Sequence, residues 1–385
     1  MLRIALKMLL GDKAKFLALI LGLTFATFII TQQAGIFTGL MQRTYGFLTD
    51  TNQPNIWVMD DQVQYIDDVK PIRFSNLYLV RGIQGVEWAV PMFKGLIKAR
   101  LQNGQFQTCN VVGIDDASLI GGPPQITAGK LTDLRRPDAV IVDEIGARKK
   151  LSSPRGQGDT SHPLHLGQTF ELNDLRAQVV GFCKLTRTFL SQPVIYTTFS
   201  RAVNYTPSER NLMTFVLARS KEGVSPKEVC TQIRAKTGLA AYTTNQFKWL
   251  TLIYYFTNTG IPINFGVAVL LGVFIGIAIS GQTFYTFAHD NRELFATFKA
   301  MGGTNNLLTK MILTQALMVA TIGWGIGIGA TSLFGMFAFG TELSFVLPWW
   351  LMLGSGLAIY LITIFSALFG IRMVIKLEPG IVFQT

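Results

Sequence analysis

Hydrophobic residues are concentrated in four runs that contain no Asp, Glu, Lys or Arg. These runs cover residues 16–42, 249–288, 311–341 and 343–371. A helix of about 20 apolar residues crosses the hydrocarbon core of a bilayer, because each residue adds about 1.5 Å to its length. Each run is long enough, so the pattern predicts four transmembrane helices rather than the buried helices of a large soluble protein.

Breakers and interfacial residues place the ends of these spans. Gly260 and Pro262 lie inside the second run and predict that its membrane helix begins there. Trp249, Tyr254 and Tyr255 precede them and are expected at the outer interface, where amphipathic rings are enriched. The spans are therefore predicted at 16–42, 262–287, 311–338 and 348–371. The first exceeds the roughly 7–15 apolar residues of a secretory signal and is expected to be a retained anchor.

Basic residues orient the chain. Lys and Arg occur in residues 1–15, in the loop 288–310 and in the tail 372–385, whereas the connection between the last two spans has none. The positive-inside rule places both termini and the 288–310 loop in the cytoplasm, and residues 43–248 outside. Residues 1–15 are expected to be an amphipathic segment. Large translocated domains are exempt from the rule, so the net charge of +11 requires no nucleic-acid partner.

Residues 43–248 have the mixed composition of a globular domain. Short β-rich runs between turn residues predict strands at 55–59, 139–142, 178–182, 193–197 and 214–218. Residues 227–236 predict a short helix, and 152–167 an exposed loop. The expected fold is a membrane protein with four transmembrane helices and a large α+β extracytoplasmic domain, of one or two subdomains, between the first and second.

Candidate catalytic and metal-binding groups are few. Cys109, Cys183 and Cys230 allow one disulfide at most, and three unpaired buried thiols fit the spacing as well. His162 and His165, with Asp159 nearby, supply too few ligands to predict a metal site. The sequence lacks Gly-x-Ser-x-Gly, His-Glu-x-x-His and a nucleotide-binding P-loop. Only 15% of the residues are charged and 49% are hydrophobic, which excludes a simple soluble enzyme.

The spans carry small residues instead of charges. Ion-coupled carriers place acidic or basic side chains inside the membrane, so their absence from the predicted spans argues against such a transporter. Glycines four residues apart let helix backbones approach closely in lipid. They are expected to serve helix packing, either within one subunit or between subunits. The glycines are Gly272, Gly276, Gly323, Gly325, Gly327 and Gly329.

The loop between the second and third spans contains a short amphipathic helix. Leu294, Phe295, Phe298 and Met301 recur at helical spacing, and Gly302-Gly303 ends the pattern. Such a helix is a docking element for a cytoplasmic partner or an interfacial helix lying on lipid, and periodicity leaves both open.

The sequence from residue 279 to 302, with its Glu293…Lys299-Ala-Met-Gly302 pattern, resembles DevC-type ABC exporter permeases of the MacB/FtsX group, also called type VII. Residues 55–59 resemble the opening strand of that group. The order of one span, an external domain and three spans agrees over nearly the whole chain. The resemblance implies a homodimeric permease in a bacterial inner membrane, worked by a separate ABC ATPase that binds ATP and Mg²⁺, so this chain holds no cofactor.

The resemblance also assigns the coupling helix and the partners. The residues that would dock on the ATPase are Arg292, Glu293, Leu294, Phe298, Lys299, Met301 and Gly302. A periplasmic adaptor and an outer-membrane channel are implied, with export of an amphiphile such as a lipid, glycolipid, peptide or drug. The alternatives are an FtsX-like mechanotransmitter that activates a cell-wall hydrolase, and a LolC/LolE-like permease that extracts lipoproteins.

Overall fold

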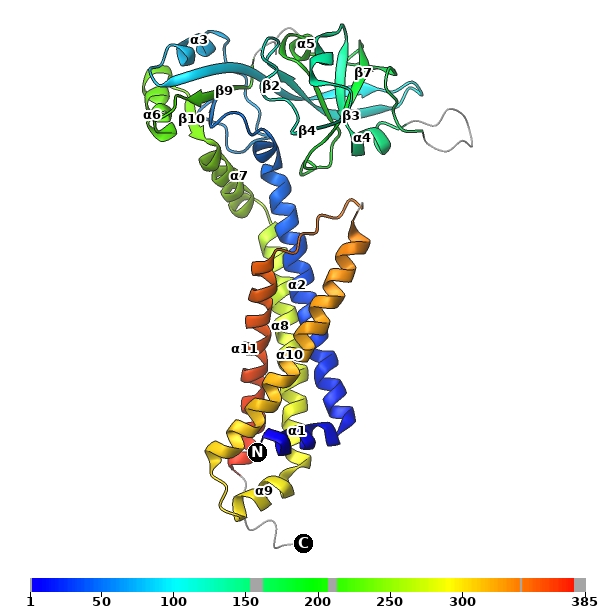
Figure 1. Cartoon of the computed structure of the whole chain (residues 1–385), viewed down its shortest axis with the longest axis vertical. Helices are drawn as coiled ribbons and strands as arrows, with labels where there is room; N and C mark the ends of the chain where they lie inside the picture. The colour runs from blue at the N-terminus through cyan, green and yellow to red at the C-terminus, as the bar shows by residue number, and fades with distance from the viewer. Residues whose placement is uncertain (1, 153–161, 207–212, 340, 377–385) are drawn as a thin grey trace. The chain divides into compact units, whose positions relative to one another are not determined.

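The computed structural model describes residues 2–152, 162–206, 213–339 and 341–376, and of residues 2–6 only the backbone (Figure 1). The chain divides into two units. A helical unit comprises Met1–Leu40 and Gly260–Thr385, and an outer unit comprises Met41–Thr259. The predicted loop at 152–167 and its Asp159 lie mostly outside the described residues.

The helical unit contains the predicted spans. Its helices are α1 (Leu2–Gly11), α2 (Lys13–Asp50), α8 (Ile261–Asp290), α9 (Arg292–Ala300), α10 (Asn305–Ala338) and α11 (Trp349–Ile375). Four of them, α2, α8, α10 and α11, are long and apolar enough to cross a membrane, which confirms the predicted number. Helix α8 begins at Ile261 with Pro262 in its first turn, as the breakers predict. Helix α2 runs past residue 42 to Asp50, so its last part belongs to the outer unit.

Four of the six predicted packing glycines lie against neighbouring helices. A Cβ atom on Gly323 would lie 2.7 Å from the Leu23 Cβ, and one on Gly327 would lie 2.4 Å from the Thr27 Cβ, so α10 and α2 approach closely there. Gly272 and Gly276 of α8 lie similarly close to α2 residues. Gly325 and Gly329 have no atom within 4 Å of the added Cβ among the described residues, so they face away from the described helices.

The described part of the outer unit contains ten strands in the order β10-β1-β9-β2-β3-β8-β5-β7-β4, with β6 beside β2 and β7. The strands are β1 (Ile56–Met59), β2 (Val86–Arg100), β3 (Phe106–Ile114), β4 (Gln125–Ala128), β5 (Ala139–Asp143), β6 (Thr169–Leu172), β7 (Leu175–Lys184), β8 (Val194–Thr198), β9 (Phe215–Ser220) and β10 (Ala240–Thr243). Five of them, β1, β5, β7, β8 and β9, overlap the strands predicted from sequence.

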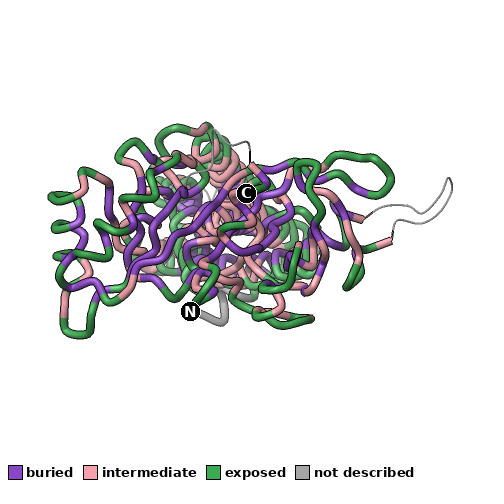
Figure 2. The backbone as a smooth tube through the Cα atoms, turned by 90° about the horizontal axis from the view of Figure 1, so that it is seen from above, coloured by how far each residue is buried: buried purple, intermediate pink, exposed green. Residues whose placement is uncertain are grey.

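The long strand β2 belongs to two subassemblies. Its second half joins β3, β8, β5, β7 and β6 in a closed ring, because β6 pairs with both β7 and β2. Side chains such as Val111, Val140 and Val179 fill the interior of this barrel. The first half of β2 lies in the flatter part, β10-β1-β9-β2, whose strands are mostly buried (Figure 2).

Six short helical segments surround the sheet. They are α3 (Ser75–Arg81), the 3-10 turn η1 (Leu131–Arg135), α4 (Glu144–Arg148), α5 (Phe199–Asn204), α6 (Pro226–Thr237) and α7 (Thr244–Asn258). Helices α3 and α6 pack on the flatter part through Leu77, Val80 and Ile233. Helix α7 packs Phe247 against the buried Trp57. Helix α6 confirms the predicted helix at 227–236, with Ser225 preceding Pro226 in its first turn.

The cysteines are three separate buried thiols. Cys109, Cys183 and Cys230 are all free, so the structure chooses this alternative over a disulfide. Burial raises the pKa of the Cys230 thiol to about 11, and raises the pKa of the other two as well. Among the described residues no group of three or more His, Cys, Asp or Glu is arranged to hold a metal ion.

Candidate coupling site

Helix α9 follows α8 after a one-residue turn. Asn291 ends α8 and begins α9, and its side-chain Nδ2 donates a hydrogen bond of 2.9 Å to the Phe287 carbonyl in the last turn of α8. The Asn291 N–H donates to the same carbonyl at 3.2 Å, so both the backbone and the side chain of Asn291 are bonded to the end of α8. The direction of α9 is thereby set by the end of a candidate membrane span.

One side of α9 is fixed to the helical bundle. Phe295 and Ala296 are fully buried, and Phe295 joins the core formed by α8, α10 and α11. Phe298 is half-buried against the same core. The Lys299 Nζ donates a 2.7 Å hydrogen bond to the Ile375 carbonyl at the C-terminal end of α11, where a positive charge is favourable. Phe298 and Lys299 therefore hold α9 in place.

The other side of α9 exposes apolar surface. Leu294 is 50% exposed and Met301 is 70% exposed, and the charged Arg292 and Glu293 are exposed beside them. An apolar pair on a polar helix surface is typical of a docking contact with another molecule. The structure thus divides the residues assigned by the resemblance. Arg292, Glu293, Leu294, Met301 and Gly302 are accessible, whereas Phe298 and Lys299 contact their own bundle.

The glycine pair ends α9 in a defined geometry. Gly302 has a φ of +90°, in the left-handed region that favours glycine. The Gly303 N–H donates to the Phe298 carbonyl and the Gly302 N–H donates to the Lys299 carbonyl, at 2.9 and 3.1 Å. These are the two bonds of a Schellman motif. Thr304 then caps α10, so the chain between α9 and α10 is a short, hydrogen-bonded corner.

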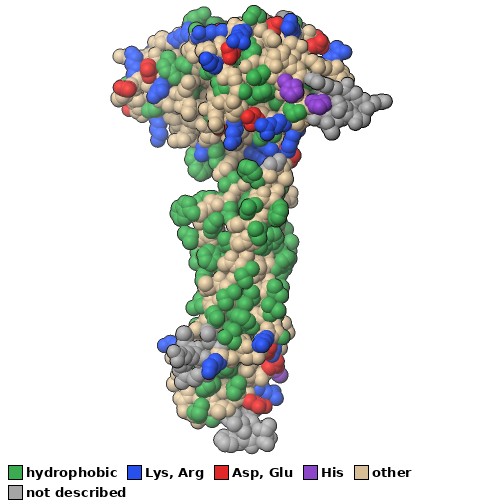
Figure 3. All heavy atoms as spheres, turned by 45° about the vertical axis from the view of Figure 1, so that its right-hand side comes forward, with side chains coloured by type: hydrophobic (Ala, Val, Ile, Leu, Met, Phe, Trp, Pro, Cys, Tyr) green, Lys and Arg blue, Asp and Glu red, His purple; other side chains and the backbone are tan. Residues whose placement is uncertain are grey.

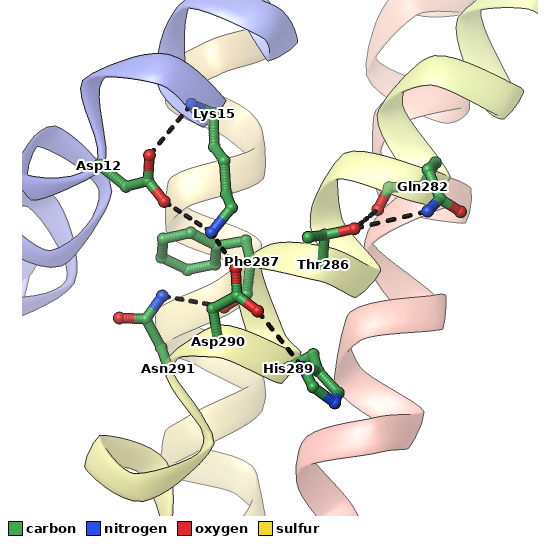
Figure 4. Close-up of polar contacts among 8 residues, drawn as sticks. All are labelled: Asp12, Lys15, Gln282, Thr286, Phe287, His289, Asp290 and Asn291. Carbon is green, nitrogen blue, oxygen red and sulfur yellow. Dashed lines mark hydrogen bonds and ion pairs between the residues drawn. The ribbon is translucent and has the colours of Figure 1, made fainter.

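An ionic cluster lies beside α9 and was missed by sequence reasoning. Lys15 of α2 forms ion pairs with Asp12, at 2.6 Å, and with Asp290 at the end of α8 (Figure 4). His289 Nδ1 lies 3.3 Å from the second oxygen of Asp290. The carboxylate of Asp290 is thus engaged within the chain. Residues 12–15 and 289–290 are far apart in sequence, and no periodicity connects them, so only the tertiary structure could reveal the cluster.

Three contacts attach α9 to the bundle. Asn291 connects it to α8, Phe295 connects it to the shared core, and Lys299 connects it to α11. Hydrophobic side chains cover the bundle on the face shown in Figure 3, and charged side chains gather near its end.

Comparisons with known proteins agree with this organisation. A model described as MacB-like periplasmic core domain matches residues 16–236, and a model described as FtsX-like permease C-terminal matches residues 242–379. No curated protein matches the chain.

Two solved structures are similar to part of the chain. The periplasmic region of MacB from Actinobacillus actinomycetemcomitans is 15% identical, with 51% of this chain and 91% of that chain covered and a TM-score of 0.37. The extracellular domain of the noncanonic ABC-type transporter YknZ from Gram-positive bacteria is 14% identical, with 49% and 99% covered and a TM-score of 0.34.

Proposed function

This chain belongs to the MacB/FtsX-like family of ABC permeases, and from this premise we propose that it is the membrane subunit of a DevC-type, ATP-driven exporter. In this proposal a partner ABC ATPase, which binds ATP and Mg²⁺, docks on α9 at the cytoplasmic side of a bacterial inner membrane. Nucleotide-driven closure of the ATPase moves α9, and the four long helices pass the motion to the periplasmic unit.

The remaining parts of the proposal follow from the family resemblance. Two copies of the chain form the permease, and the periplasmic unit contacts an adaptor that leads to an outer-membrane channel. The cargo is an amphiphile, such as a lipid, glycolipid, peptide or drug. The chain itself carries out no bond chemistry in this assembly.

The observation that supports the proposal best is the two-sided character of α9. Leu294 and Met301 are exposed, while Phe295 on the opposite side is fully buried in the bundle core. A helix that lies on lipid needs no such attachment to the bundle. A lever between a partner and the bundle requires both an accessible surface and a rigid attachment.

The decisive experiment removes the accessible surface and keeps the attachment. The variant Leu294→Asp with Met301→Asp is purified with its ABC ATPase and reconstituted in nanodiscs. Replacing two apolar anchors of an interface costs about 2 kcal/mol or more, so co-purification of the ATPase and stimulation of its ATP hydrolysis should each fall at least about tenfold. The melting temperature of the permease should change little, because both side chains are exposed.

A matched control is Asn306→Asp, which adds a charge at an exposed position in the first turn of α10. A negative charge is favourable at a helix N-terminus, so this variant should keep full stimulation. Normal ATPase stimulation by the double variant, or an equal loss in the control, would refute docking through Leu294 and Met301.

A further inference from the structure

A cleft of about 360 Å³ lies within the outer unit, on the outside of the barrel. Lys94, Leu96 and Asn110 line it from β2 and β3, at positions that alternate with the barrel-core residues Phe93 and Cys109. Alternate residues of a strand point to opposite faces, so the cleft lies on the face away from the barrel core. Its volume falls within the range of roughly 300–1,000 Å³ that is usual for small-molecule sites.

Aromatic and aliphatic side chains form the walls. The rings of Tyr65 and Tyr254 are stacked at 4.3 Å, and the rings of Phe189 and Tyr255 are 4.9 Å apart. Leu96 is 60% exposed and lines the same cleft. Apolar groups that remain accessible within a concave surface favour an apolar ligand.

The walls are held in place before any ligand arrives. The segment 185–193, between β7 and β8, carries Phe189 and is fixed by Asp50, whose carboxylate accepts hydrogen bonds from the Thr186 N–H and hydroxyl at 2.7 and 3.1 Å. The Thr188 hydroxyl closes the tip of the segment by accepting a 2.9 Å bond from the Gln192 N–H. A preformed cleft lowers the ordering cost of binding.

The charged groups of the cleft compensate each other. Lys94 is almost completely buried and forms an ion pair with Asp67. Its Nζ also lies 5.3 Å from the centre of the Phe47 ring. Burial raises the pKa of both Tyr65 and Tyr255, so their hydroxyl groups remain neutral. A charged ligand would compete with the ion pair, and the cleft therefore favours a neutral one.

Polar side chains complete the lining. Thr188, Gln192 and Asn110 lie in the wall of the cleft beside the apolar groups. A few polar groups among apolar ones are typical of small-molecule sites, because they fix the orientation of the ligand.

We propose that this cleft binds a small neutral amphiphile, with its apolar part against Leu96, Phe189 and the tyrosines and its polar part beside Thr188 and Gln192. The site goes beyond the proposed export function and does not require it.

The test uses the full chain in nanodiscs and a neutral photoreactive probe, trifluoromethyl-diazirinyl benzyl alcohol, which has one hydroxyl donor. After irradiation, mass spectrometry should locate labelled residues around Tyr65, in 185–193 and around Tyr254.

A variant at an exposed position keeps the test independent of the protein core. Leu96→Trp should fill the cleft and abolish labelling there, whereas Leu175→Trp, at an exposed strand position outside the cleft, should leave it unchanged. Labelling that survives Leu96→Trp, or labelling spread evenly over the exposed apolar surface, would overturn the proposal. Neither outcome depends on an ATPase or on transport.

Discussion

Buried threonines of the helical unit and a buried aspartate of the outer unit use their polar groups in opposite ways. In the bundle, Thr27, Thr331 and Thr363 donate to the carbonyl four residues earlier in their own helix, at 2.7–2.9 Å. In the outer unit, Asp143 of β5 accepts bonds from the Gly146 N–H at the start of α4 and the Val194 N–H of β8, each at 2.6 Å. These threonines add local bonds, whereas the aspartate joins separate elements.

The two units also differ in how many large apolar side chains their surfaces expose. Large apolar side chains such as Phe274, Phe337 and Leu357 are exposed along the helices of the bundle. Helices satisfy their backbone polar groups internally, so they tolerate a hydrocarbon surrounding, whereas the sheet of the outer unit buries its apolar side chains in three clusters. Burial of apolar side chains within the chain therefore stabilises the outer unit, whereas the exposed apolar side chains of the bundle require a lipid surrounding.

The largest effect is expected on removing the Asp143 carboxylate, which connects β5 to α4 and β8. Asp143→Ala removes two hydrogen bonds to a buried acidic group, and should lower the free energy of unfolding of the outer unit by about 3–6 kcal/mol. Burial raises the pKa of this carboxyl group, but its two backbone donors oppose that effect. Thr363→Val in the bundle removes one local bond and should cost about 1 kcal/mol or less. Urea unfolding followed by limited proteolysis measures both. Equal costs would break the comparison.

The next effect concerns the exposed surface of the bundle. Phe274 is 65% exposed near the middle of α8, and Phe274→Asp should oppose membrane insertion by about 3 kcal/mol. Phe106→Asp, at an equally exposed position of β3 in the outer unit, should change insertion and stability by about 0.5 kcal/mol or less. Glycosylation-mapped insertion assays give the first value. An unaffected Phe274 variant would show that this surface does not face lipid.

The smallest effect separates two glycines of one helix. Gly327→Leu places a side chain against Thr27 of α2 and should destabilise the bundle by about 1–3 kcal/mol through overpacking. Gly325→Leu points into open space among the described residues and should leave the monomer stable. Thermal melts in detergent distinguish the two variants. A change of oligomeric state in the Gly325 variant alone would assign that face to contact between subunits, and identical melts would contradict close packing of α10 on α2.

The number and order of the long helices could be predicted from the sequence, because each is encoded by a long run of apolar residues. Runs of more than twenty residues without charge admit few structures, so the four spans and the start of α8 at Gly260-Pro262 followed directly. The strands around 139–142 and 178–182 could also be predicted, because both are short runs rich in β-forming residues. The closure of the barrel by β6 was not, because pairing of β6 with β2 joins segments about seventy residues apart.

Helix α9 shows where local patterns stop being sufficient. Leu294 and Phe295 are adjacent and both apolar, and helical spacing assigned both to one apolar face. In the structure Phe295 is buried in the core and Leu294 is exposed. The end of α11 decided the position of Lys299, because its Ile375 carbonyl accepts the Lys299 hydrogen bond.

Hydrophobic run length and the places of helix breakers thus determined the number of spans and the class of the chain, since the bilayer imposes one length on every crossing helix. The neighbours of each side chain were decided only by the tertiary structure. Gly327 and Gly325 have the same local sequence character, yet one touches α2 and the other does not. Asn110 is an ordinary strand residue in the sequence, and only the fold buries its carboxamide oxygen beside a cleft. Such differences arise because packing brings together residues that no local pattern connects.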